Sequence, residues 1–330
     1  MLKSSIEDQH IIELLQTHYG VEVHTVQLMS EGADTEALAY KADSQTNSYF
    51  VKLKYGYYNE INLSLVHHLY HSGIKEIILP IPTVENKFMQ QLEHSKIIVY
   101  PFIHALNGFT KELTKEQWLN LGRTVKKIHE ASVPDLIQQQ LRKEMYSAQW
   151  RDLVRSLYSR MEPDISDNKI TADFKLYFKE KIDQIHQLVD SAEELSKKIH
   201  FDPQLNVLCH TDIHAGNILV DDNDSIHIID WDEPMLAPKE RDLMFIGGGV
   251  GNVWNRSHEV SWFYEGYGNL SINKTILSYY RHERIVEDVA IYGQDILAEK
   301  QTEQSRLEML HHFKGMFAVN GVVEIAFASE

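Results

Sequence analysis

The sequence has little of what a secreted, membrane-spanning or cysteine-dependent protein needs. Its 330 residues include one cysteine, Cys209, which excludes an internal disulfide and a metal cluster held by cysteines. No apolar run approaches the roughly 20 residues that span a bilayer. Residues 1–10 carry Lys3, Glu7 and Asp8 where a signal peptide has an apolar segment. We therefore expect a cytoplasmic protein in which Cys209 packs beneath neighbouring elements rather than reacts.

Basic residues are scarce relative to acidic ones. Lys and Arg number 32 against 48 Asp and Glu, which gives a formal net charge of −16. Nucleic-acid binding relies on clustered Lys and Arg, so we expect no DNA or RNA partner, and nothing predicts a membrane or an obligate protein partner. An acidic surface suits a small cationic substrate, although it can equally serve solubility alone.

Glycine-rich phosphate loops are also missing. The polar turn at residues 30–35 has one glycine, so its backbone amides either cup a phosphate or form an ordinary hairpin turn. Glycines cluster at residues 247–251, but no Gly-Lys-Ser/Thr ending follows them, which argues against a Walker loop.

The most informative segment that is present reads His-Thr-Asp-Ile-His-Ala-Gly-Asn at residues 210–217, followed by Ile-Ile-Asp-Trp at 228–231. Apolar runs at 218–220 and 226–229 flank a polar turn and predict a hairpin between Asn217 and Asp230. Phosphoryl transfer needs a carboxylate beside the attacking hydroxyl and hard oxygen ligands for Mg²⁺. The pattern predicts Asp212 as the catalytic base, with Asn217 and Asp230 as the metal ligands.

Two histidines of this segment carry less information. His210, between Cys209 and the loop, is more typical of a hydrogen-bonded scaffold residue than of an acid or base. The role of His214 stays open.

Apolar periodicity predicts an α+β protein with a small β-rich N-terminal lobe, residues 1–100, and a larger, mainly helical C-terminal lobe, residues 101–330. In the first lobe we expect helices over 6–18 and 60–71, and strands over 21–29, 37–42, 49–53, 77–81 and 97–103. In the second we expect helices over 115–130, 147–161, 171–199, 274–300 and 305–316.

A lysine lies on one of the expected apolar strands. Lys52 follows Val51 in the run Phe-Val-Lys-Leu, and a charged side chain on a buried face needs a partner. Lys54 shares the same face of the strand and is the rival candidate. The Val-x-Lys pattern favours Lys52.

The loop pattern H-x-D-x-x-x-x-N, with its hairpin and following Asp, resembles that of the aminoglycoside phosphotransferase family. The similarity extends to the stretch around Asp34 and to residues 49–64 and 228–295. It implies a bilobal protein-kinase-like fold and an enzyme that uses ATP and Mg²⁺. The implied acceptor is a hydroxyl of spectinomycin or a close aminocyclitol, so that the reaction confers antibiotic resistance.

The resemblance also implies a nucleotide site. Lys52 is expected on the α- and β-phosphates, oriented by Glu60, with Asp34 in the same half of the site. The run Val-Tyr-Pro-Phe-Ile at 99–103 resembles an inter-lobe hinge. Because proline has no N–H, we expect the purine to use the Tyr100 carbonyl and the Phe102 amide, unless the run is a plain edge strand. Asp242 resembles the family's buttress of the catalytic loop.

On the acceptor side, carboxylates are expected to meet the amines of a cationic substrate. Asp232 and Glu233 closely follow Asp230, and helical spacing leaves Glu287 and Asp288 off the core face of their helix, facing either substrate or water. Trp231 is expected to wall the site, together with Trp254 and Tyr267.

Other functions share parts of this pattern. Choline, homoserine, fructosamine and methylthioribose kinases have the same core motif. A protein kinase is disfavoured because Asp230 and Asp242 lie too close together for an activation segment. A non-catalytic nucleotide-binding module is disfavoured because Lys52, Asp212 and the two expected metal ligands are all present.

Overall fold

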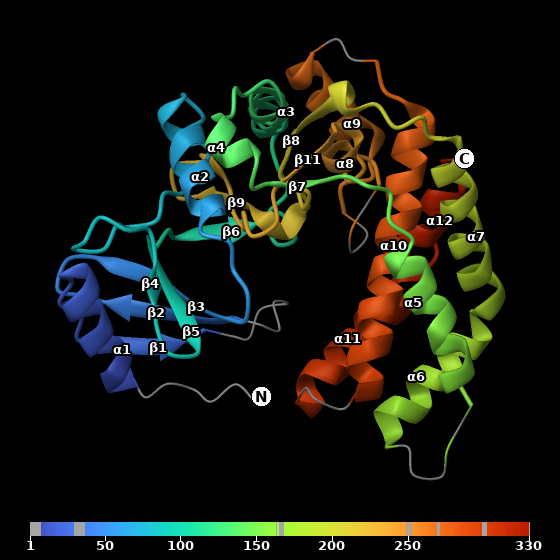
Figure 1. Ribbon diagram of the computed structural model, residues 1–330, viewed down its shortest axis with the longest axis horizontal. Helices are drawn as coiled ribbons and strands as arrows, with labels where there is room; N and C mark the ends of the chain where they lie inside the picture. Colours follow the sequence, from blue (N-terminus) through green and yellow to red (C-terminus); the bar gives the residue numbers. More distant parts are fainter. Residues whose placement is uncertain are drawn as a thin grey trace.

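The computed structural model describes residues 8–29, 37–162, 164, 168–248, 250, 253–268, 271–298 and 302–329. Figure 1 shows a small lobe built on one sheet, a larger lobe beside it, and an arm of long helices that extends from the larger lobe. None of the helices in the described ranges combines the length and apolar character of a membrane span.

The small lobe is a five-stranded antiparallel sheet with one helical segment against it. The order is β1 (Thr25–Leu28), β2 (Ala37–Asp43), β3 (Ser48–Tyr55), β5 (Ser95–Pro101) and β4 (Gln90–Gln91). Helix α1 (Asp8–Leu14) runs into a π-helical turn that ends at Gly20, whose φ of 65° suits a residue without a side chain. The alternate inward residues of β2 and β3 pack with α1 into this lobe's core.

Helix α2 (Ile61–His71) belongs largely to the other lobe by its packing. Leu65, Val66 and Leu69 on its buried face join the core beneath the catalytic loop. The chain beyond it forms a bridge from Ile77 to Ile228, so α2 lies beside the larger lobe (Figure 1). Leu63, near its first turn, packs with Ile98 of β5, so the start of α2 also contacts the small sheet.

Two three-stranded sheets carry the loops of the larger lobe. One has the order β10 (Ile226–Ile228), β9 (Ile218–Asp221) and β6 (Ala105–Asn107). The other has the order β7 (Arg142–Lys143), β11 (Met235–Pro238) and β8 (Asn206–Cys209). Residues 210–217 connect β8 to β9, so the sequence motif lies where the two sheets meet.

Helices α3 (Lys115–His129) and α9 (Ser257–Tyr267) pack behind these sheets. A side chain at Gly122 would collide with the Phe263 carbonyl, and one at Gly266 with the Leu119 carbonyl. The two glycines thus allow the helix backbones to approach closely. The short helices α4 (Asp135–Gln138) and α8 (Glu240–Leu243) complete this part of the lobe.

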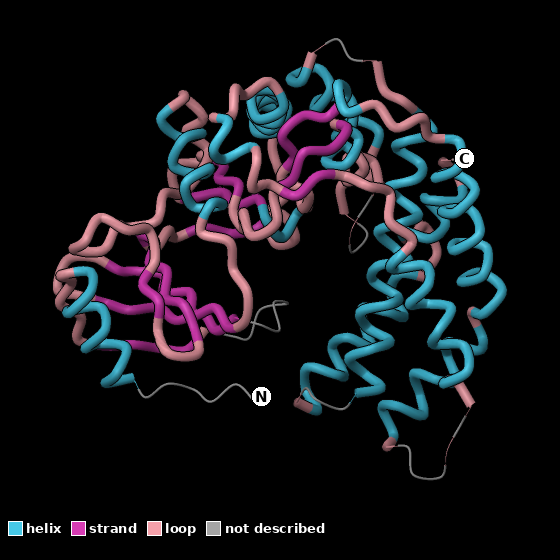
Figure 2. The backbone as a smooth tube through the Cα atoms, viewed as in Figure 1, coloured by secondary structure: helices cyan, strands magenta, loops and turns pink. Residues whose placement is uncertain are grey.

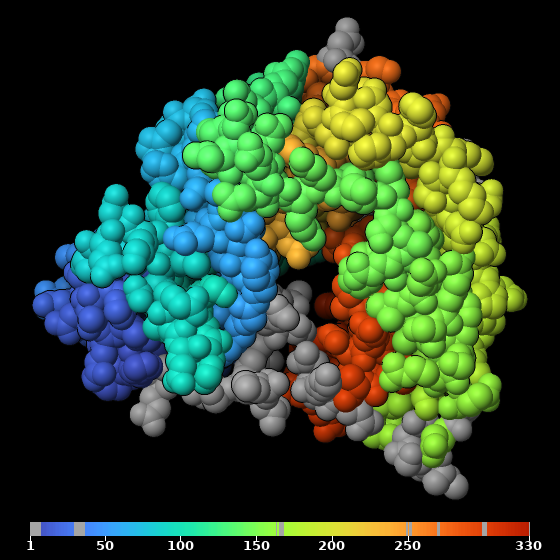
Figure 3. All heavy atoms as spheres, viewed as in Figure 1, coloured from blue at the N-terminus to red at the C-terminus, as the bar shows by residue number. Residues whose placement is uncertain are grey.

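The helical arm consists of α5 (Gln149–Leu157), α6 (Lys169–Glu180), α7 (Ile182–Lys198), α10 (Lys274–Ala298), α11 (Glu303–Met316) and α12 (Val322–Phe327). They share a core that is separate from the core of the catalytic lobe. Figure 2 shows the arm as helices only, standing opposite the small sheet. The space-filling view shows a hollow between the small lobe and the arm (Figure 3).

Most expected elements are confirmed, and three are wrong in detail. Residues 77–81 do not form a strand: Ile77 makes an isolated bridge to Ile228, and the Ile81 amide donates a hydrogen bond to the Val99 carbonyl. The helix expected over 171–199 is two helices that meet at Lys181, without a proline or glycine to signal the break. The strand expected over 97–103 ends at Pro101.

Candidate active site

The catalytic loop is anchored from below by Asp242. Its carboxylate accepts hydrogen bonds from the amides of His210 (3.0 Å) and Thr211 (2.6 Å) and lies 3.0 Å from His129 Nε2. Burial raises the pKa of Asp242, but His129 and His210 outweigh it and hold the pKa below its ordinary value. Asp242 is therefore a buried anionic acceptor, which confirms its expected role as a buttress.

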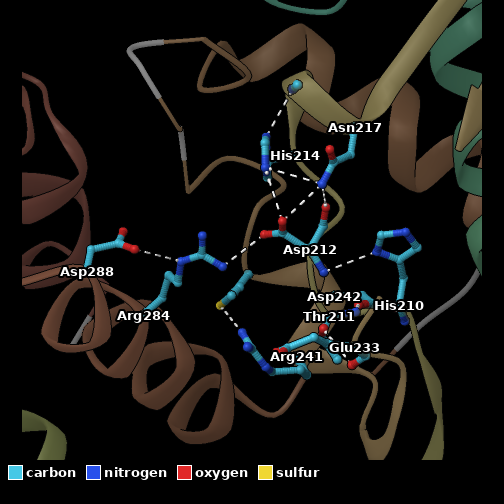
Figure 4. Close-up of polar contacts among 12 residues, drawn as sticks. His210, Thr211, Asp212, His214, Asn217, Glu233, Arg241, Asp242, Arg284 and Asp288 are labelled. Atoms are coloured by element: carbon cyan, nitrogen blue, oxygen red, sulfur yellow. Dashed lines mark hydrogen bonds and ion pairs between the residues drawn. The ribbon is translucent and has the colours of Figure 1, made fainter. Parts of the chain in front are cut away.

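The anchor holds a strained backbone. Thr211 has φ of 80°, which is costly for a β-branched residue and persists only where the surroundings fix it. The Thr211 hydroxyl donates to the Glu233 carbonyl at 3.1 Å, which adds a second restraint. This turn presents the next residue, Asp212, toward the open side of the loop (Figure 4).

His210 links the loop to the segment after β10. Its Nδ1 accepts from the Asp212 amide at 3.2 Å, so Nε2 carries the proton and donates to the Ile229 carbonyl at 2.9 Å. Its ring meets the Trp231 ring edge to face, with centroids 4.6 Å apart. The scaffold role expected for His210 is confirmed.

Asp212 lies at the centre of a polar network (Figure 4). Its Oδ1 accepts from Arg284 Nη1 at 2.9 Å, and its Oδ2 accepts from Asn217 Nδ2 at 3.0 Å. His214 Nε2 lies 3.3 Å from the same Oδ2. Burial raises the pKa of Asp212, but Arg284, His214 and His210 outweigh it, so the pKa falls far below its usual range. The carboxylate is ionised at neutral pH.

His214 has a local structural role as well. Its Nδ1 accepts from the Gly216 amide at 3.0 Å and caps the short turn that leads to Asn217. A side chain at Gly216 would crowd the His214 ring. The turn thus sets the distance between Asp212 and Asn217.

Asn217 and Asp230 offer the oxygen donors that suit Mg²⁺. The Asn217 amide nitrogen donates to Asp212, which orients its oxygen away from that carboxylate. Asp230 follows β10 with φ of 65°, an unusual value for a residue with a side chain, and its side chain is 38% exposed. Strained, accessible carboxylates are typical of functional positions.

Lys52 joins the small lobe to this loop. Its Nζ lies 3.1 Å from Asp230 Oδ1 and 2.8 Å from Asp232 Oδ2, while Lys54 Nζ lies 3.3 Å from Asp232 Oδ2. Burial lowers the pKa of Lys52, but the two carboxylates outweigh burial and raise the pKa above its ordinary value. Lys52 therefore contacts the expected metal ligand directly, and Lys54 does not share that contact.

The expected pair between Lys52 and Glu60 is not the one observed. Glu60 is exposed at the N-terminus of α2, whose apolar face packs into the larger lobe. The carboxylates beside Lys52 come from Asp230 and Asp232. Asp232, expected on the acceptor side, thus lies beside Lys52, and Asn62 Nδ2 donates to its carbonyl at 2.6 Å.

The backbone groups expected to bind the purine take part in the pairing between β3 and β5. The Phe102 amide already donates to the Ser48 carbonyl at 2.9 Å. Tyr100, two residues before Phe102, pairs with Phe50 in the register of β3 and β5. In an antiparallel ladder these alternate residues face the neighbouring strand. Pro101 lies between these two residues, so its carbonyl faces away from β3, as the Val99 carbonyl does toward the Ile81 amide.

The expected acceptor residues divide into two groups. Asp288, on α10, accepts from Arg284 Nε at 3.2 Å, and Glu287 is half-buried beside it. Glu233 is largely exposed, and its carboxylate meets Arg142 Nη2 at 3.0 Å. Trp231, Trp254 and Tyr267 are buried in the core beneath the loop, so they do not wall a site. Asp34 lies outside the described residues.

Arg284 is the site residue that sequence reasoning missed. The sequence could have predicted its ion pair with Asp288, since residues four apart on a helix are neighbours. Its contact with Asp212 joins residues 72 positions apart, and no local pattern encodes that contact.

Comparisons with known proteins agree with this geometry. The model of the phosphotransferase enzyme family matches residues 32–266. A crystal structure of the spectinomycin phosphotransferase APH(9)-Ia with ADP and spectinomycin is 63% identical over 99% of each chain, with a TM-score of 0.95. Its AMP-bound complex is 62% identical over 98% of this chain and 99% of that one, with a TM-score of 0.91. No match is found among curated proteins.

More distant structures share the fold alone. An amicoumacin kinase in complex with AMP-PNP and Ca²⁺ is 15% identical, covers 98% of this chain and 94% of its own, and has a TM-score of 0.64. Together with the close matches it confirms the expected bilobal kinase-like fold. The chain therefore belongs to the phosphotransferase enzyme family.

Proposed function

We propose that this protein transfers the γ-phosphoryl group of ATP, with Mg²⁺, to a hydroxyl of spectinomycin or a close aminocyclitol antibiotic. The choice of substrate rests on the 63% identity, over 99% of each chain, to an enzyme whose structure holds ADP and spectinomycin. The arrangement of Asp212, Asn217 and Asp230 around one loop supports the reaction type.

The nucleotide half lies between the lobes. Lys52 is the cation for the α- and β-phosphates, since it already bridges carboxylates at the loop and moves with β3. The Pro101 carbonyl and the Ile103 amide are the backbone pair for the adenine edge, because the ladder with β3 uses the alternate residues. Asn217 and Asp230 are the ligands for Mg²⁺, which neutralises charge on the phosphates when bound.

Asp212 serves the acceptor. The acceptor hydroxyl donates its hydrogen bond to the carboxylate, which orients the oxygen toward the γ-phosphorus and takes the proton as the new O–P bond forms. The bond between the γ-phosphorus and the bridging oxygen breaks, and ADP leaves. Asn217, His214 and the buttress Asp242 keep the carboxylate in place throughout.

The acceptor's amines need anionic partners. Glu287 and Asp288 follow Arg284 by three and four residues on α10, and both are half-buried. Their carboxylates match the positive charges of an aminocyclitol with two amines.

A substrate panel tests the proposal. Spectinomycin, a kanamycin-type aminoglycoside, choline and homoserine are offered separately with ATP and Mg²⁺, and ADP release and phosphorylated product are measured. We expect turnover of spectinomycin alone. Exclusive turnover of choline or homoserine contradicts the proposal, and phosphorylation of many aminoglycosides keeps the reaction class but discards the substrate.

A further inference from the structure

Arg284 binds Asp212 at a position where an amine of a cationic acceptor could bind instead. Its guanidinium bridges two carboxylates, with Nη1 at 2.9 Å from Asp212 Oδ1 and Nε at 3.2 Å from Asp288 Oδ1. It also lies over the Phe245 ring, 5.6 Å from its centroid. The side chains of Arg284, Asp212 and Asp288 are 30%, 32% and 26% exposed, so the cluster is open to a ligand (Figure 4).

A catalytic carboxylate that lies near other carboxylates can bind an amine of the substrate in place of the hydroxyl that reacts. An ammonium group is a stronger partner for an anionic carboxylate than a neutral hydroxyl is, because the attraction between opposite charges adds to the hydrogen bond. An aminocyclitol carries amines and hydroxyls on the same rings. If an amine pairs with Asp212, the substrate is bound with no hydroxyl in line for transfer.

We propose that Arg284 is a specificity-determining residue that occupies the cation position on Asp212, so that the acceptor's ammonium groups pair with Asp288 and Glu287 and a hydroxyl takes the remaining position on Asp212. The inference rests on the proposed function, because it requires a cationic acceptor. It assigns to Arg284 a role in the orientation of the bound substrate.

The arrangement of donors and acceptors fits this role. Asn217 and His214 both lie at Oδ2 of Asp212, whereas Oδ1 accepts only from Arg284 among the described residues and keeps one further lone-pair site for a hydroxyl. Arg284 uses only Oδ1 of Asp288, and no described residue donates to Oδ2. An ammonium group can therefore pair with Asp288 while the guanidinium stays in place.

The local charge supports the same conclusion. The negative charges of Asp212, Glu287 and Asp288 stabilise the protonated guanidinium of Arg284. Three carboxylates and one guanidinium give this cluster a net charge of −2. A dication neutralises this cluster. Without Arg284 the net charge becomes −3, so a cationic ligand is attracted more strongly and Asp212 is open to it.

Replacement of Arg284 by a neutral residue gives a kinetic pattern that simple loss of structure does not. Non-productive binding lowers kcat and KM together, because the substrate is held more often in orientations that do not react. In Arg284→Met we expect KM for spectinomycin to fall several-fold and kcat to fall by about tenfold or more. Arg284→Lys keeps the charge and should recover most of both constants.

The experiment compares the parent with Arg284→Met, Arg284→Gln and Arg284→Lys, using steady-state kinetics and calorimetric titration of spectinomycin. Gln294→Ala, at an exposed position of the same helix, is the matched control and should behave like the parent. KM for ATP, ATP hydrolysis without acceptor and the melting temperature show whether a variant is folded and binds nucleotide. If Arg284→Met does not fold, Arg284→Gln carries the comparison.

A raised or unchanged KM for the acceptor in the neutral variants overturns the proposal, and so does an unchanged kcat. These outcomes differ from failure of the proposed function. If the parent turns over another cationic acceptor, the ratio of variant to parent is measured with that acceptor, and the proposal for Arg284 is tested on its own.

Discussion

Lys52 reaches the catalytic loop from β3 of the small lobe, whereas Asp212, Arg284 and Asp288 all lie on the larger lobe. The contacts of Lys52 with Asp230 and Asp232 are ion pairs between the two lobes, so their geometry depends on the position of one lobe relative to the other. The cluster of Asp212, Arg284 and Asp288 is held within one lobe by a buried buttress and a long helix. If the proposed function holds, the acceptor half is preorganised, while the nucleotide half is completed by the position of the lobes.

Removal of the catalytic carboxylate should have the largest effect. Asp212→Asn keeps the shape and one acceptor oxygen but loses the base, so kcat should fall on the order of a hundredfold or more. Because Lys52 and Asp230 are unchanged, KM for ATP should stay close to that of the parent. Near-normal turnover, measured by coupled ADP release, would remove Asp212 from this role.

Loss of the lysine that links the lobes should come next. Lys52→Ala removes the cation shared by Asp230 and Asp232, and we expect KM for ATP to rise by about tenfold or more. Lys54→Ala is the comparison variant, since Lys54 lies 3.3 Å from Asp232, farther than the 2.8 Å of Lys52. The reverse ranking of the two variants would transfer the phosphate role to Lys54.

The acceptor half should show its own pH dependence. Burial raises the pKa of Asp288 to about 6, with Glu287 and Asp212 adding to the shift and Arg284 opposing it. Protonation below that pH removes the negative charge, so KM for spectinomycin should rise several-fold as the pH falls from 7.5 to 5.5.

Asp288→Asn is neutral at every pH and should lose that part of the dependence, while its KM for ATP follows the parent. The groups that face Asp288 are Arg284, Glu287, Asp212 and Tyr292. An identical pH profile in the parent and in Asp288→Asn would place the titrating group elsewhere.

The smallest effect is expected at Glu60. Its side chain is exposed and Lys52 has other carboxylates, so Glu60→Ala should change kcat and KM for ATP by less than about twofold. A loss comparable to that of Lys52→Ala would show that α2 moves to bring Glu60 against Lys52 when nucleotide binds.

Local spacing predicted the parts of the site that lie close together in the chain. Asp212, Asn217 and the hairpin that leads to Asp230 follow from a short loop and two short strands, and the buttress Asp242 follows soon after. The lysine strand was readable for the same reason, since alternation along β3 places Lys52 and Lys54 on one face.

The parts that depend on distant packing were not readable. The position of Glu60 is decided by where the apolar face of α2 docks, and the contact of Arg284 with Asp212 by how α10 crosses the loop. Which backbone groups of β5 face away from β3 depends on the register of the two strands, and an error of one residue reverses that choice. Trp231 directly follows Asp230 in the sequence, yet its indole is buried against the His210 ring.

Separate calorimetric titrations of Mg²⁺-ADP and of spectinomycin test the division of the site most directly. In Lys52→Ala we predict that ADP binding weakens by about tenfold or more while spectinomycin affinity stays within about twofold of the parent. In Asp212→Asn both ligands should still bind although turnover is lost. Equal weakening of both ligands by Lys52→Ala would contradict the account, because it would show that the acceptor half also depends on the contact between the lobes.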